Sequence, residues 1–112
     1  MIFETKNGSS LDSDLISNYL DSLVNRFFKI LPIREENEES LGVYLNSFQQ
    51  ELIGCKGLII ALNNDALFLS LISSLQYLID NPECSVQTVR RNVFNSISVC
   101  KKLKSNYTSN QN

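Results

Sequence analysis

The run from residue 35 to residue 39 carries the densest group of chemically active side chains in this chain. Glu35-Glu36-Asn37-Glu38-Glu39 places four carboxylates within little more than one helical turn. Carboxylate oxygens are ligands that magnesium prefers, so this run is the best candidate for metal chemistry. An acidic first turn is the other interpretation, because the dipole at a helix N-terminus stabilises negative charge. We prefer this second interpretation.

The E-E-x-x-E spacing within this run resembles the first half of the metal-binding motif in all-helical nucleotide pyrophosphatases of the MazG type. That resemblance implies a magnesium-dependent nucleotide hydrolase. The family completes its site with an E-x-x-D element on a later helix. Here the residues three places before Asp65 and Asp80 are Leu62 and Tyr77, so the second element is missing. We therefore expect no metal site, no cofactor and no catalysis.

Histidine is absent from the sequence, and the cysteines form no motif. Without histidine, the chain lacks the usual activator of a serine or cysteine nucleophile and the commonest general base. Cys55, Cys84 and Cys100 are widely spaced, which fits neither a disulfide framework nor a zinc site. Cys55 and Cys100 fall in apolar seams, whereas Cys84 is expected in an accessible loop. Free thiols and an N-terminus without a signal-peptide pattern predict a cytoplasmic protein.

Charge is unevenly distributed along the chain. Residues 1–83 hold all 12 acidic residues and five basic ones, a balance of −7, while residues 84–112 hold five basic residues and no acidic one, a balance of +5. These add to the net charge of −2. Such a split indicates either a polar partner surface or attraction between the two ends within one fold, and we favour the second. The candidate charged recognition residues are Glu35, Glu36, Glu38, Glu39, Arg90, Arg91, Lys101, Lys102 and Lys104.

The basic residues of the C-terminal segment make nucleic-acid binding the first alternative function. On a helix, Arg91 and Lys102 would face outward, Arg90 and Lys101 would lie nearer the apolar flank, and Lys104 would lie almost on it. This arrangement is not one continuous basic stripe. Aromatic residues that could stack on bases are not interleaved with it. We therefore rank nucleic acid below protein as a partner.

Apolar periodicity predicts an all-α fold, an antiparallel four-helix bundle in one domain. The helices are expected over about residues 10–31, 38–62, 65–80 and 85–104, with Ser10, Asp65 and Ser85 as N-caps and Phe94 at the flank of the buried face of the last helix. A short N-terminal arm, residues 1–9, and a flexible polar tail, residues 105–112, flank the domain 10–104. Whether the second helix continues through Gly54 and Gly57 is left open, because each glycine costs roughly 1 kcal/mol relative to alanine in a helix.

The stretch from Ala66 to Ile79 is apolar on nearly every side. Ten of its fourteen residues are apolar and none is charged, yet as a helix it would span only about 21 Å, too short for a ~30 Å hydrocarbon core. Such a helix must be surrounded by its own chain or by a partner, and both interpretations stay open. The candidate interface residues are Phe27, Phe28, Leu67, Phe68, Leu71, Tyr77 and Leu78.

Together these patterns predict a non-enzymatic helical protein that binds another protein, or a second copy of itself, through apolar helix faces. In length and four-helix layout the chain is similar to the small cytosolic immunity proteins that protect bacteria from their own bacteriocins. This resemblance concerns layout, which does not fix function. The expected role is that of an accessory, regulatory or immunity-type subunit, in which charged ends set the orientation of the partner.

Overall fold

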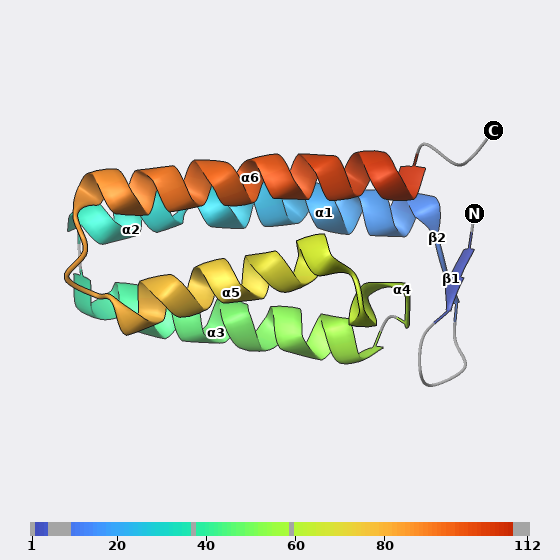
Figure 1. Cartoon of the computed structure of the whole chain (residues 1–112), viewed down its shortest axis with the longest axis horizontal. Coiled ribbons are helices and arrows are strands. Elements are labelled where there is room, and N and C mark those ends of the chain that lie inside the picture. The colour runs from blue at the N-terminus through green and yellow to red at the C-terminus, as the bar shows by residue number, and fades with distance from the viewer. Residues whose placement is uncertain (1, 5–9, 37, 59, 109–112) are drawn as a thin grey trace.

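The computed structural model of the protein describes residues 2–4, 10–36, 38–58 and 60–108, and the side chains within 14–36, 40–57 and 62–107. Figure 1 shows its elements along the chain. In chain order they are β1 (Ile2–Glu4), β2 (Ser10–Asp12), α1 (Ser13–Phe28), α2 (Ile30–Glu36), α3 (Glu38–Leu58), α4 (Ile60–Asn63), α5 (Ala66–Asp80) and α6 (Val86–Thr108).

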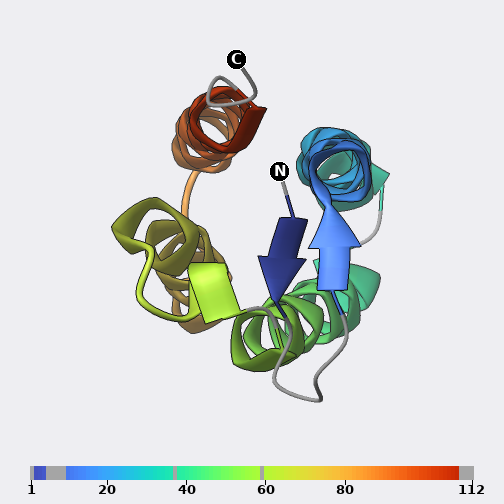
Figure 2. The same cartoon turned by 90° about the vertical axis from the view of Figure 1, so that its right-hand side faces the viewer.

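Four helical rods make up the bundle: α1 with α2, then α3, α5 and α6 (Figure 1). The contacts between these rods are compatible with the predicted antiparallel arrangement. The last turns of α6 meet the middle of α1, where the Lys104 Nζ lies 3.0 Å from the Asp21 Oδ2. The start of α6 meets α2, where Arg90 lies 4.0 Å from Glu35. Viewed along the bundle, α6 and α1 lie on one side, and α5 and α3 lie on the other (Figure 2). The all-α fold class is thus confirmed.

The core runs between the rods along the seams that the periodicity predicts. In the α3 seam, Leu41, Leu45, Phe48 and Leu52 are all buried. Phe48 packs against Phe27 of α1 with ring centroids 4.8 Å apart. Burying one such side chain contributes roughly 1.5–3 kcal/mol to the free energy of unfolding. Packing along these seams therefore holds the rods in register.

Helix α5, the apolar stretch, is covered mostly by its own chain. Its buried side chains are Phe68, Leu71, Leu75 and Leu78. It packs against α3 on one side and α6 on the other. Among its large apolar side chains, only Tyr77 is exposed. The apolar character of α5 therefore serves mainly the core.

The N-terminal part differs from the expectation of an arm followed by a helix from residue 10. Ile2–Glu4 and Ser10–Asp12 pair as antiparallel strands, with Phe3 opposite Leu11. Ser10 therefore does not cap a helix, and α1 begins at Ser13. The hairpin packs against α1 and α4 at one end of the bundle (Figure 2). Pairing between segments distant in sequence has overridden the local helix-start pattern.

The first predicted helix is divided near Pro32. Helix α1 ends at Phe28, Lys29 forms a turn, and α2 runs through Pro32. Proline has no N–H to donate to the carbonyl of Phe28, which breaks the hydrogen-bond ladder there. Proline nevertheless fits the first turn of a new helix. The expected stop is therefore a break followed by a second short helix.

Two other helix ends differ from the prediction, and the open question about the second helix is answered. Helix α3 is continuous through Gly54 and Gly57 and ends at Leu58, and the rest of the predicted second helix includes the separate turn α4. Helix α6 reaches Thr108, so the first four residues of the predicted tail are helical. Residues 109–112 of that tail and residues 5–9 of the predicted arm lie outside the described residues.

A candidate docking surface on helices α1 and α6

The predicted interface residues divide into a buried and an accessible group. Phe27, Phe68, Leu71 and Leu78 are buried in the chain's own core. Leu67 is half-buried. Phe28 and Tyr77 keep 42% and 46% of their surface exposed. Among these seven residues, Phe28 and Tyr77 therefore offer a partner the largest accessible area.

Phe28 lies beside a residue that the sequence placed only at the flank of a buried face, Phe94. Their rings meet edge to face, with centroids 5.8 Å apart and planes at 82°. Phe94 is 45% exposed, so two large aromatic side chains form one apolar patch at the outer junction of α1 and α6. Periodicity assigns each ring to the edge of its own helix, but only the packing of the helices brings the two together.

Basic side chains of α6 surround this aromatic pair. Arg90 and Arg91 lie one helical turn before Phe94, and Lys101 lies two turns after it. Arg91, Lys101 and Lys102 are exposed and have no ion pair with any described residue. An aromatic patch beside unpaired cations suits a partner that is apolar at its centre and acidic around it.

The expected attraction between the two ends of the chain is present for only part of the basic set. Arg90 pairs with Glu35 and Lys104 pairs with Asp21. Both pairs are substantially exposed, and such pairs contribute at most about 1 kcal/mol each. They orient α6 on α1 and α2 but leave the remaining cations of α6 available. We define the docking surface as Phe28, Phe94, Arg91, Lys101 and Lys102.

Within the 35–39 run, Glu35 and Glu36 lie at the end of α2, just before the start of α3. Glu35 pairs with Arg90, and Glu36 is exposed. The side chains of Glu38 and Glu39 lie outside the described residues, although their backbone begins α3. Among the residues that the structure describes, no group of three or more His, Cys, Asp or Glu side chains is placed to hold a metal ion.

The cysteine thiols differ in their surroundings. Cys100 is buried, and Cys55 and Cys84 are half-buried. Desolvation raises the pKa of Cys100 to about 12 and also raises the pKa of Cys55. A thiol with a raised pKa stays protonated near neutral pH, which makes it a poor nucleophile. Near Cys84, the Arg34 Nη2 donates to the Cys84 carbonyl over 3.1 Å and thereby ties α2 to the loop before α6.

Comparisons with protein-family models, with characterised proteins and with solved structures find no match to this chain. Within the described part of the chain, none of the helices has both the length and the apolar character needed to cross a membrane. The docking surface is therefore interpreted from its own residues.

Proposed function

We propose that this protein binds another protein through the docking surface on α1 and α6, and that the partner presents an acidic surface with an apolar centre. The observation that carries the proposal is the exposed Phe28–Phe94 pair beside three cations that form no ion pair with any described residue. Aromatic residues and arginine are enriched where binding energy concentrates in interfaces. No catalytic step is part of this role, which is that of an accessory or regulatory subunit.

The docking surface supports the proposal better than α5 does. In α5, Tyr77 is the one large apolar residue that is exposed, whereas the side chains of Phe68, Leu71, Leu75 and Leu78 are buried in the core. A single exposed side chain is ordinary for a protein surface. In the docking surface, by contrast, the rings of Phe28 and Phe94 adjoin each other beside the same cations and together form an apolar patch.

The charge of the docking surface also bears on self-association. In a two-fold dimer formed through this surface, the same patch of each copy would face the other. Arg91, Lys101 and Lys102 of one copy would then lie against the same three cations of the second copy. Like charges in contact oppose such pairing. We therefore propose a different protein as the partner for this surface.

Nucleic acid is the second candidate, because Phe94 lies among the basic residues of α6 and is exposed. This exposed ring differs from the expectation that no aromatic residue is interleaved with the basic residues, and base stacking on an aromatic ring is worth about 1–3 kcal/mol. An exposed ring paired edge to face with Phe28, however, offers a base only part of its face.

Affinity capture with matched variants tests the proposal. The tagged chain is used as bait in nuclease-treated extract of its source cells, and each retained protein is quantified by mass spectrometry. Phe94→Ala and Arg91→Glu should each reduce recovery of the partner about tenfold, as expected for central interface residues. Tyr77→Ala is the aromatic control, since Tyr77 and Phe94 are 46% and 45% exposed. Lys56→Glu is the charge control on α3.

Two results would contradict the protein-binding proposal. In the first, Tyr77→Ala loses the partner while Phe94→Ala retains it, which would move the interface to α5. In the second, the chain retains its partner from untreated extract but not from nuclease-treated extract, which would show that capture depends on nucleic acid. Binding of a labelled oligothymidine that weakens steeply with salt would then support the nucleic-acid candidate.

A further inference from the structure

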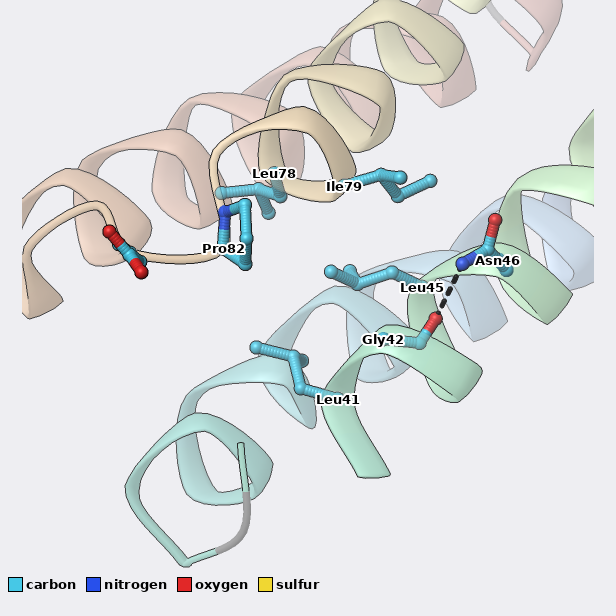
Figure 3. Close-up of a pocket in the computed structure, with 8 residues that line it drawn as sticks. Leu41, Gly42, Leu45, Asn46, Leu78, Ile79 and Pro82 are labelled. Carbon is cyan, nitrogen blue, oxygen red and sulfur yellow. Dashed lines mark hydrogen bonds between the residues drawn. The ribbon is translucent and has the colours of Figure 1, made fainter. Parts of the chain in front are cut away.

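A second feature of the surface lies on the opposite side of the bundle, between α3 and the end of α5. Figure 3 shows apolar side chains from both helices and from the following loop around one groove. Its volume is about 310 Å³, which is at the lower end of the range for ligand pockets. The apolar lining residues are Leu41, Leu45, Leu78, Ile79 and Pro82.

The groove stays open because two α3 residues on its wall do not fill it. Gly42 has no side chain, and a Cβ built at this position meets no other atom within 4 Å. The Asn46 side chain turns back along its own helix, where its Nδ2 donates to the Gly42 carbonyl over 2.8 Å (Figure 3). The opening is therefore part of how the two helices pack and needs no side-chain movement.

The walls of the groove are held together one helical turn further along α3. The buried Gln49 side chain donates from its Nε2 to the Gln76 Oε1 over 2.8 Å and to the Ile72 carbonyl over 3.3 Å. These bonds join α3 to α5 through a buried amide. A pre-formed site avoids part of the ordering cost of binding.

Acidic residues lie at and near the mouth of the groove, together with the Arg34 guanidinium, which donates to the carbonyl of Cys84, the residue after Glu83. Glu83 lines the groove, and Asp80 lies three residues before Glu83. Glu36 is the last residue of α2, which ends at the same end of the bundle (Figure 1). Among the described residues, none of these three carboxylates has an ion pair. Asp80 accepts a hydrogen bond from the Gln76 Nε2. An apolar slot with an acidic mouth complements an apolar side chain flanked by cations.

We propose that the groove between α3 and α5 binds a basic peptide segment of a partner protein and that it holds one apolar anchor side chain, such as leucine or phenylalanine. The groove favours a basic partner, whereas the docking surface on α1 and α6 favours an acidic one. The proposal for the groove does not depend on the docking surface. The chain would thus contact a partner, or two partners, through two faces of opposite sign.

A direct test uses synthetic peptides as probes. A fluorescein-labelled amphipathic peptide of lysine and leucine is titrated with the protein, and anisotropy reports binding. Versions with alanine for leucine and with glutamate for lysine test the apolar and the basic requirements in turn. We expect each change to weaken binding at least tenfold.

Matched glycine variants locate the binding site. Gly42→Leu places a side chain in the groove and should weaken binding of the lysine–leucine peptide at least tenfold. Gly54→Leu is the control, because a Cβ there also meets nothing within 4 Å and Gly54 does not line the groove. Glu83→Gln should weaken binding about threefold at low salt and less at high salt.

An NMR titration of the unsubstituted protein keeps the test independent of variant folding. Amide signals of Leu41, Leu45 and Ile79 should shift on peptide addition. The proposal is overturned if those signals do not shift, if the alanine peptide binds equally well, or if Gly42→Leu binds as the unsubstituted protein does. Self-association by light scattering that Gly42→Leu abolishes would also overturn it, since a second copy would then be the occupant.

Discussion

Phe94 shows at the residue scale how a candidate site depends on exposure as well as residue type. Helical spacing alone does not distinguish buried aromatic residues from exposed ones. Packing of the helices buries Phe27 and Phe68 and leaves Phe28 and Phe94 accessible. Seven candidate interface residues were predicted, and four of them are core. Phe94 was assigned to a flank because its helix alone does not indicate that Phe28 lies beside it.

Cys100 leads to a prediction about pH. Its thiol has a folded pKa of about 12, raised by desolvation from the ordinary value of 9.0. The protonated thiol thus contributes stability that is complete below pH 9 and is lost as pH rises toward 12, because the unfolded thiol releases its proton first. One such group lowers the free energy of unfolding by about 1.4 kcal/mol per pH unit in this window.

Urea unfolding of the unsubstituted protein and of Cys100→Ala between pH 8 and about pH 11 measures that slope. The variant should start less stable, because a buried side chain is truncated, but its stability should fall less steeply above pH 9. Equal slopes in the two proteins would contradict the assignment. The pKa values of Tyr19 and Tyr107 are also raised, chiefly by desolvation, so both proteins should lose further stability above pH 10.

At the scale of elements, Asp65 connects the start of α5 with the end of α6. Its Oδ1 accepts from the backbone N–H groups of Leu67 and Phe68 over 2.9 and 3.1 Å. Its Oδ2 accepts from the Tyr107 hydroxyl over 2.6 Å. One carboxylate therefore caps α5 and fixes the last turns of α6, which explains why α6 continues past its predicted end at residue 104.

Substitutions at this junction should separate the two roles. Asp65→Ala should lower the free energy of unfolding by about 2 kcal/mol, because it removes the N-cap and a hydrogen bond to a charged group. Tyr107→Phe removes only the second interaction and should cost about 1 kcal/mol.

Thermal or urea unfolding gives these free energies, and hydrogen exchange gives their location. In Tyr107→Phe, amides of the last turns of α6 should lose protection while those of α5 keep it. Equal loss of protection in both helices would show that the cap and the hydroxyl contact do not act separately.

The elements also show where sequence reasoning succeeds. The Asp65 cap, the Ser85 cap of α6 and the α3 seam follow from local spacing, and each is present. The hairpin of Ile2–Glu4 with Ser10–Asp12 depends on contact between separate segments. The local pattern around Ser10 does not contain this information and predicts a helix cap instead. Local signals thus identified the bundle, whereas pairing across the chain determined its ends and its surface.

At the scale of the molecule, the bundle separates two surfaces of opposite charge. The docking surface on α1 and α6 carries Arg91, Lys101 and Lys102 beside an aromatic pair. The groove on the α3 and α5 side has Glu83 at its mouth. Within the described residues, α6 is thus only partly paired with the acidic residues of the earlier helices, through Arg90 with Glu35 and Lys104 with Asp21.

Site-specific photocrosslinking in the source cells tests most directly whether α6 and not α5 faces the partner. A benzoyl-phenylalanine is placed at Ser98, which is exposed one turn beyond Phe94, or at Ser73, which is exposed on α5. We predict a nuclease-resistant protein adduct from position 98 that Phe94→Ala abolishes, and no such adduct from position 73. An adduct from position 73 alone, or one from position 98 that nuclease removes, would contradict the proposed docking surface.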